Sequence, residues 1–298
     1  MKLKRAQCFL IMRSVWIAAL AGAAITAGAA TWTGGGSSLN WSDPGNWDAA
    51  SPPAIGVSAI FDKTIGFTNA AGVVNNVADT DFTFGSLVYS ALSSAGNYHT
   101  TLIPAGQTLS VTGTRSTVVG TGGYSSTDTL FVGSGAADGA SATVYATIAG
   151  QGSLVLSNAS GNLDITQTTT GGSSSTRATL DLSGLDTFNA YVSQVRVGFG
   201  SGGNDTGGNR PSGTLILAKT NVITCASTTW GLAVGQVGSN PGQPSTNLLG
   251  QANWIQADYG IGIGRRKCSA TLAFTPGLVD PSVVFRNAAG TGPMSHWV

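Results

Sequence analysis

Two short phrases recur along the chain, and this repetition constrains the fold more than any other feature of the sequence. The first phrase is an aliphatic pair separated by one residue and followed by Gly, at 130–133, 195–198, 232–235 and 261–264. The second is a strand of the Leu-x-Leu type, at 153–156, 179–182, 214–217 and 271–274. Because side chains alternate along a strand, each phrase places two apolar side chains on one face.

The clearest match between repeats sets residues 217–223 against 249–255, and it aligns Asn221 with Asn253. An irregular period of a few tens of residues is typical of a solenoid, in which each unit buries its apolar strand face against its neighbours. We therefore predict an all-β protein with a right-handed parallel β-helix from about Gly113 onward. A β-sandwich made of similar strands is the alternative.

Each part of the repeat has an expected place in such a helix. The Gly after each aliphatic pair permits a tight corner. Asn221 and Asn253 are expected at corners too, either in left-handed backbone or stacked as an amide ladder. The side chains expected to face inward are Leu154, Leu180, Val197, Leu215, Leu217, Val234 and Ile263.

Composition favours the same fold class. Of the 298 residues 43 are Gly, only 9% are charged, and all 13 acidic residues are Asp. Helices are disfavoured because Glu is absent and Lys is scarce, whereas the plentiful aliphatic residues argue against disorder. Short strands joined by Gly-rich turns are what this composition predicts.

The N-terminus predicts export. Basic residues precede an uncharged apolar run at 14–26, and the small residues Ala27-Gly28-Ala29 follow it. This order is typical of a secretory signal peptide at 1–30, cleaved near Ala29 or Ala30, and no membrane span is expected in the mature chain. Cys8 lies before the apolar run, so no lipid anchor is expected. The expected location is therefore secreted or at the cell surface. The mature chain would carry ten basic and 13 acidic residues, which makes nucleic acid an unexpected partner.

Residues 31–112 are expected to form a Trp-rich N-terminal cap with the first strands, and 113–298 the repeats. Trp32, Trp41 and Trp47 lie close together in this opening segment. One interpretation is that they cover the open first unit of the solenoid, which would otherwise expose its aliphatic end. The other is that their indole faces bind carbohydrate, with nearby Asn and Asp side chains contacting the hydroxyls.

The residues also resemble a family. Asn40-Trp41-Ser42, Gly45-Asn46-Trp47 and the two recurring phrases look like the autotransporter-associated β-strand repeat proteins, and the likeness covers most of the mature chain. The resemblance implies a right-handed parallel β-helix displayed outside a bacterial cell, with no established catalytic residues. Such proteins often continue into a C-terminal sorting segment. No apolar span follows Cys268, so we expect a chain that is secreted free or that stops partway through a coil.

The chemistry-bearing residues predict neither a catalytic site nor a metal site. His99 and His296 lie near no nucleophile motif, and zinc ligands lack the needed spacing. Cys225 and Cys268 are either bridged or idle thiols. Three further candidates are a calcium site at 202–209, a pair of catalytic carboxylates, and a site for anionic glycans or lipid headgroups at 265–267. The carboxylate pair would be Asp181 and Asp186 with Arg196, or Asp79 with Asp81. For each candidate we prefer the interpretation that the residues are solvated side chains in loops or at corners.

The function predicted from the sequence is an exported structural or adhesive β-repeat protein without catalytic activity or cofactor. Extracellular polysaccharide or cell-surface components are the expected partners. The alternatives are a carbohydrate-binding module of a surface protein and a polysaccharide lyase or hydrolase.

Overall fold

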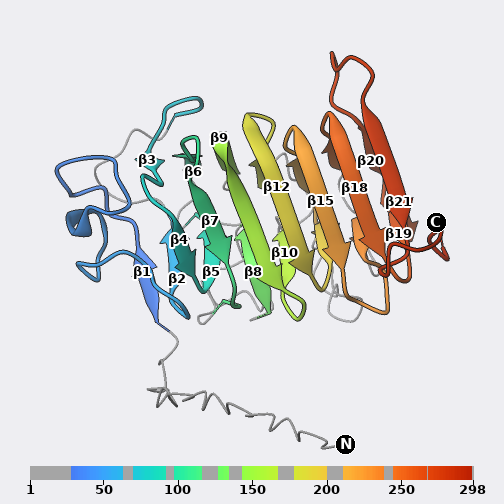
Figure 1. The fold of residues 1–298 in the computed structure, drawn as a ribbon, viewed down its shortest axis with the longest axis horizontal. Helices are drawn as coiled ribbons and strands as arrows, with labels where there is room; N and C mark the ends of the chain where they lie inside the picture. The colour runs from blue at the N-terminus through green and yellow to red at the C-terminus, as the bar shows by residue number, and fades with distance from the viewer. Residues whose placement is uncertain are drawn as a thin grey trace, which may run out of the picture.

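The computed structural model describes residues 28–62, 70–91, 97–115, 127–133, 143–166, 178–199, 211–237, 244–266 and 268–296. Apart from one short 3-10 helix, η1 (Pro44–Asn46), their regular structure consists of β-strands. The strands pair in parallel in curled sheets, so the prediction of an all-β protein is confirmed (Figure 1).

The strands form three faces that run the length of the molecule. The first face contains β1 (Ala29–Thr31), β2 (Ser58–Phe61), β5 (Ser86–Tyr89), β8 (Asp128–Val132), β10 (Asn162–Ile165), β13 (Val195–Phe199), β16 (Leu232–Val237) and β19 (Ile261–Arg266). The second face contains β3 (Asn76–Val77), β6 (Asn97–Leu102), the first part of β9 (Val144–Asn158), β11 (Ala178–Asp181), β14 (Gly213–Ile216), β17 (Ser245–Leu249) and β20 (Ala270–Phe274). The third face contains β4 (Phe82–Phe84), β7 (Thr108–Val111), the later part of β9, β12 (Leu185–Val192), β15 (Thr220–Cys225), β18 (Ala252–Ala257) and β21 (Ser282–Arg286).

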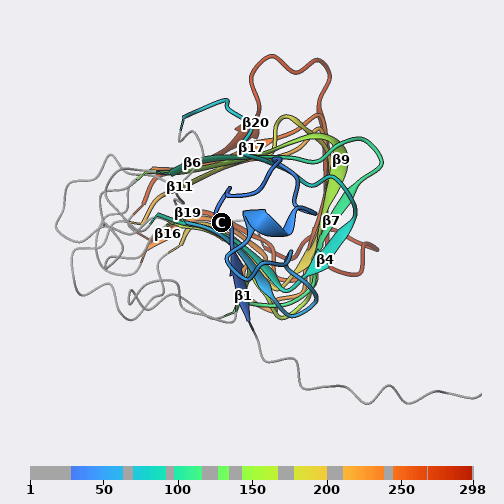
Figure 2. The same cartoon turned by 90° about the vertical axis from the view of Figure 1, so that its left-hand side faces the viewer.

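The chain visits the three faces in turn, so each strand pairs with the strand one circuit further along. Thus β10, β11 and β12 pair with β13, β14 and β15, and all three pairings are parallel. Figure 2 looks along this stack and shows the successive circuits lying over one another. The sandwich alternative requires antiparallel neighbours, and the pairings between the strands named above are parallel.

Inward side chains of successive circuits form continuous apolar columns. On the first face, register aligns Leu130, Leu163, Val195, Leu232 and Ile261, and each is at most 1% exposed. Burying an aliphatic side chain of this size contributes about 1.5–3 kcal/mol, so the columns offset the entropy cost of ordering a Gly-rich chain.

Six of the seven predicted inward residues are buried: Leu154, Leu180, Val197, Leu215, Leu217 and Val234. Ile263 packs against the core but is only partly buried. It lies in β19, the last strand of the first face in the described chain, so one side of its column is uncovered.

The glycines that follow the aliphatic pairs have the left-handed backbone expected of them, but they lie inside the strands and not at corners between strands. Gly198, Gly235 and Gly264 follow the aliphatic pairs of β13, β16 and β19, and their φ angles are 62°, 66° and 66°. L side chains rarely adopt this conformation. At Gly198 space is limiting as well, because a Cβ would lie 2.0 Å from Oγ of Ser245.

The predicted alignment of Asn221 with Asn253 is confirmed in register and in side-chain contact. The two residues are paired between β15 and β18, and Nδ2 of Asn221 donates to Oδ1 of Asn253 at 2.9 Å. Asn221 also accepts from the backbone N–H of Ala218 at 3.0 Å and donates to its carbonyl at 2.7 Å. The amide-ladder interpretation is therefore the correct one, since neither residue has a positive φ.

Two details of the repeat differ from the sequence expectation. The phrase at 153–156 lies on the third face, where Leu154 pairs with Phe188, whereas 179–182 and 214–217 belong to the second face. Both faces need alternating apolar residues, so the phrase alone does not specify a face. In addition, circuits begin before Gly113, because β2 and β5 already stack on the first face. Their aromatic residues Phe61 and Tyr89 lack the following Gly that marks later repeats.

Candidate functional site

The three tryptophans of the opening segment are buried and pack on the first circuit. Trp32, Trp41 and Trp47 are 0%, 0% and 3% exposed. Trp47 packs edge-on against the other two, with ring centroids 5.1 and 5.3 Å apart, and Phe61 lies beneath all three. The η1 segment crosses this end of the stack (Figure 2). All three indoles are buried and leave no free face for a sugar, which supports the capping interpretation over the carbohydrate-binding one.

Polar contacts hold this cap to the second face. Nε1 of Trp41 donates to Oδ1 of Asn76 at 2.6 Å, and Nδ2 of Asn76 contacts Nε2 of His99 at 2.5 Å. Phe61 lies against the imidazole, with ring centroids 4.5 Å apart. Burial lowers the pKa of His99 to about 3, so the imidazole is neutral at physiological pH. His99 is thus a core residue of the cap.

The residues expected at signal cleavage lie in the first strand. Ala29 and Ala30 belong to β1 and pair with Ser58 and Ala59 of β2. Residues 1–27 of the expected signal peptide lie outside the described residues. Cleavage between Ala29 and Ala30 would leave Ala30, which is 1% exposed, at the start of the first circuit.

The carboxylates singled out in the sequence make local contacts. Asp181 accepts from the hydroxyl of Tyr145 at 3.1 Å and from Ser183, and Asp186 pairs with Lys219 at 2.5 Å on the surface. Burial and the Asp181 charge raise the pKa of Tyr145 to about 12. Asp79 accepts from Ser42, and Asp81 accepts from the N–H of Thr108. Each carboxylate thus fixes a turn or a neighbouring circuit.

Sequence reasoning missed a buried charged cluster on the outer side of the first face. Arg115 donates to Asp128 at 3.0 Å, and both side chains are fully buried. Register places Asp164 beside Phe131 of β8 and Arg196 of β13. Burial, reinforced by the Asp164 charge, raises the pKa of Asp128 to about 7, and burial also raises the pKa of Asp164. No local motif signals this cluster, since its members come from separate circuits.

The guanidinium groups of this cluster have partners besides the carboxylates. Arg115 lies over the ring of Phe131, 4.3 Å from its centroid, and Arg196 lies 4.7 Å from the ring centroid of Phe199. Arg196 also donates to Oε1 of Gln194 at 2.8 Å. Two carboxylates and two basic groups therefore converge, as a polysaccharide-cleaving site would require, but Asp128 and Asp164 are only 1% and 6% exposed.

The remaining candidates lie apart from one another. Cys225 and Cys268 are both free thiols, and burial raises the pKa of Cys225 to about 12. His296 stacks on Tyr259, with ring centroids 4.4 Å apart. Within the described ranges, no group of three or more His, Cys, Asp or Glu could hold a metal ion. The calcium candidate at 202–209 lies outside the described residues.

Of the basic run at 265–267, the structure describes the side chain of Arg265 alone. Its guanidinium lies 4.1 Å from the ring centroid of Trp230 and donates to Oε1 of Gln236 at 2.8 Å. Arg265 thus contacts residues of the preceding circuit.

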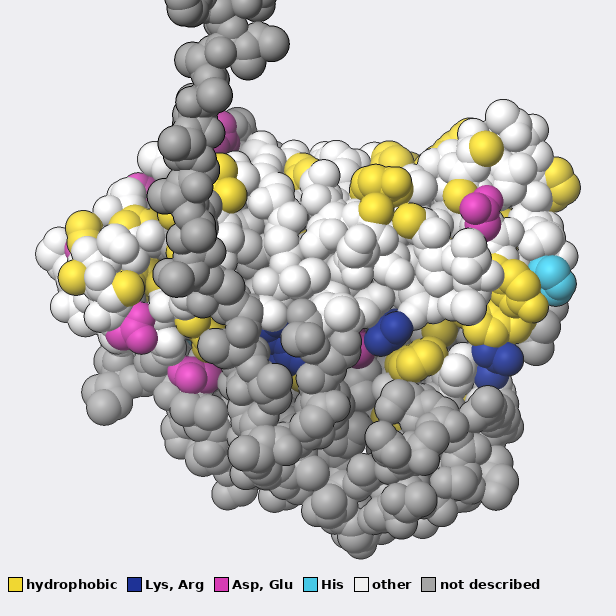
Figure 3. Space-filling view, turned by 90° about the horizontal axis from the view of Figure 1, so that it is seen from below, with side chains coloured by type: hydrophobic (Ala, Val, Ile, Leu, Met, Phe, Trp, Pro, Cys, Tyr) yellow, Lys and Arg dark blue, Asp and Glu magenta, His cyan; other side chains and the backbone are white. Residues whose placement is uncertain are grey.

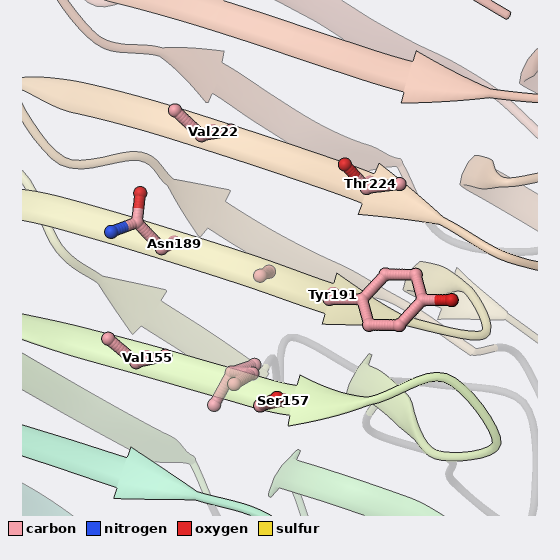
Figure 4. A pocket seen from close by; sticks show the side chains of 8 residues that line it. Val155, Ser157, Asn189, Tyr191, Val222 and Thr224 are labelled. Atoms are coloured by element: carbon pink, nitrogen blue, oxygen red, sulfur yellow. The ribbon is translucent and has the colours of Figure 1, made fainter. Parts of the chain in front are cut away.

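The outer side of the third face is open and largely uncharged. A hollow of about 200 Å³ crosses β9, β12 and β15, and its rim includes Val155, Ser157, Asn189, Tyr191 and Val222 (Figure 4). The phenol of Tyr191 extends from the rim toward the end of β12 (Figure 4). The described surface is sparsely charged elsewhere too, as the view from below shows (Figure 3). This hollow is suited to binding rather than acid–base chemistry, because its rim offers hydroxyl, amide and apolar groups.

No family model, curated protein or solved structure matches this chain. Among the described residues, no helix is long and apolar enough to cross a membrane.

Proposed function

We propose that this protein is an exported structural or adhesive β-repeat protein that acts at the cell surface or outside the cell, without catalytic activity. We further propose that its parallel strands wind as a right-handed β-helix. The observation that carries the proposal is the register of the three faces, which stacks apolar columns from circuit to circuit beneath a Trp-covered first end. Such a scaffold supports extended surfaces that can be presented to a partner.

Export is the part of the proposal that rests on the leader sequence. A basic flank and an apolar run are followed by Ala27-Gly28-Ala29, and Ala29 is the first residue of β1. The test is to express the whole chain in a bacterial host, to separate cytoplasm from exported fractions, and to sequence the N-terminus of the recovered protein. We expect an exported form that begins at Ala30 or Thr31. Recovery only of cytoplasmic protein beginning at Met1 would contradict export.

The polysaccharide-cleaving alternative has a specific structural candidate in Asp128 and Asp164. Their burial supports a structural role, because a substrate must reach a catalytic carboxylate. Purified protein incubated with pectins, alginates and xylans, with and without calcium, should release no unsaturated or reducing ends. Turnover that is lost in an Asp128→Asn or Asp181→Asn variant would overturn the non-catalytic proposal.

The carbohydrate-binding alternative does not rest on the cap tryptophans. Its support comes from aromatic residues that the fold leaves exposed: Tyr191 and Trp254 on the outer side of the third face are 50% and 39% exposed.

A further inference from the structure

The middle of the outer side of the third face carries an ordered array of uncharged side chains. Register between β9, β12, β15 and β18 aligns its outward residues in two rows across the strands. The first row is Val155, Asn189, Val222 and Trp254, and the second is Ser157, Tyr191, Thr224 and Gln256. Figure 4 shows six of these side chains standing on three neighbouring strands. We call these two rows the third-face array.

Three of the exposed large apolar side chains of the described residues gather in this array. Tyr191, Val222 and Trp254 are 50%, 43% and 39% exposed. By contrast, Trp41 of the cap, which packs in the core, is completely buried. Large exposed apolar groups gathered on one surface are characteristic of binding sites. Here they alternate with amide and hydroxyl groups, which can donate and accept hydrogen bonds.

The charges around the array limit the chemistry of its ligand. Neither row contains a charged side chain between β9 and β18. The surface ion pair of Asp186 and Lys219 lies at the edge where these strands begin, and Arg286 lies beyond Gln256 on β21. An anionic polymer would find no line of basic groups here, which binding of nucleic acids or acidic glycans requires. An uncharged polyhydroxylated ligand suits the array better.

The spacing of the aromatic groups fits a linear ligand. Parallel strands lie about 4.8 Å apart and a strand rises about 3.3 Å per residue. Tyr191 on β12 and Trp254 on β18 lie two strands and two residues apart, so they are separated by about 12 Å on a diagonal across the array. That span is about the length of two sugar rings joined in a chain. The C–H face of a pyranose ring can pack on an aromatic ring, while Asn189, Thr224 and Gln256 lie within the rows to contact hydroxyls.

We propose that the third-face array binds an uncharged linear polysaccharide laid across strands β9 to β18, with Tyr191 and Trp254 packing against its sugar rings. This proposal specifies the adhesive role proposed above. It depends on export only in one respect: export decides which polysaccharides the protein encounters in nature. Binding itself can be tested with purified protein. The hollow, which is lined by residues of both rows, would then receive one sugar unit.

The test measures binding to uncharged polysaccharides (cellulose, mannan and xylan) and to acidic ones (alginate and polygalacturonate), by pull-down and affinity electrophoresis. We expect retention on at least one uncharged polymer and none on the acidic ones. Tyr191→Ala and Trp254→Ala should each lower the affinity about tenfold, since one aromatic contact contributes about 0.5–1.5 kcal/mol beyond its buried area. The double variant should abolish retention.

Tyr259→Ala is the matched control, because Tyr259 is 37% exposed but belongs to neither row: it lies past the end of β18 and packs against Trp230 and His296. It should bind like the wild type, and thermal unfolding should show that all variants keep the fold. Retention on acidic polymers alone, or on no polymer, would overturn the proposal. So would a self-associating protein whose dimer is lost in the double variant, because the array would then bind a second copy. Binding by a protein that is not exported would contradict export alone.

Discussion

At the scale of single residues, buried amides occupy columns that are otherwise aliphatic, and their contacts differ. Asn247 is 1% exposed, and register places it between Leu215 and Leu272. Neither side-chain polar atom of Asn247 has a hydrogen-bond partner in the described part of the chain. Asn221 is equally buried but bonds to Ala218 and Asn253. Burial of a polar group is costly only where its hydrogen bonds are missing.

We therefore expect Asn247→Leu to stabilise the protein, by about 1–2 kcal/mol, because it removes an unsatisfied amide and completes an apolar column. Asn221→Leu should destabilise it by about 1–3 kcal/mol, since it leaves the backbone groups of Ala218 without their partner. Denaturant unfolding of the two variants measures both changes. Equal effects of the same sign would show that the hydrogen bonds do not decide the outcome.

His99 gives the stability of the protein a pH dependence. Its pKa falls from 6.5 to about 3 on burial, so between these values the unfolded chain binds a proton that the folded chain does not. The free energy of unfolding contributed by His99 is complete above pH 6.5 and decreases as the pH falls. One such group lowers it by about 2 kcal/mol between pH 7 and pH 5.

The measurement compares denaturant unfolding at pH 7 and pH 5 for the wild type, for His99→Gln and for the exposed control His296→Gln. The raised pKa of Asp128 acts in the opposite direction, because the stability it contributes is lost as the pH rises from 3.8 toward 7. That contribution is common to all three proteins. We expect His99→Gln alone to lose stability less on acidification. Identical pH dependence in all three would contradict a neutral, buried His99.

At the scale of elements, the glycines with positive φ differ in how much space surrounds them, whether they lie inside a strand, as Gly198 does, or between two strands, as Gly277 does. Gly198 and Gly277 both have positive φ, at 62° and 88°, but a Cβ at Gly277 would meet nothing within 4 Å. Gly277→Ala should therefore cost about 1–2 kcal/mol for conformation alone. Gly198→Ala should cost clearly more, because the Cβ would also displace Ser245. Thermal unfolding of the pair checks this order, and a reversed order would contradict it.

Elements also show what the sequence could predict. The aliphatic phrases and the offset between Asn221 and Asn253 are local or periodic, so the repeat period predicted their arrangement correctly. The contact of Asp128 with Arg115 and the nearness of Asp164 depend on which circuits lie side by side on the first face. Tyr191 is exposed because it lies on the outer side of the third face, and Trp41 is buried because it lies inside the first end of the stack. Residue type does not specify either.

At the scale of the whole molecule, the two ends of the described stack differ. Trp41 is fully buried at the first end, whereas the inward residues Leu272, Phe274, Val283 and Phe285 of the last circuit are only partly buried. Trp41→Ala should destabilise the protein by about 3–5 kcal/mol, since it opens a cavity beneath η1. Trp254→Ala, which truncates an exposed indole, should cost less than about 1 kcal/mol. Similar losses in thermal stability for both variants would contradict the cap.

The coincidence of register between Asn221 and Asn253 has an evolutionary consequence. Their separation of 32 residues is one full circuit, and both residues make the same contacts with the turn before them. An in-frame duplication of such a segment inserts one circuit and lengthens the stack by about 4.8 Å. Only neighbouring circuits meet the new one, so both ends keep their surroundings. Duplications of this kind can therefore lengthen the protein by whole circuits during evolution without changing its fold.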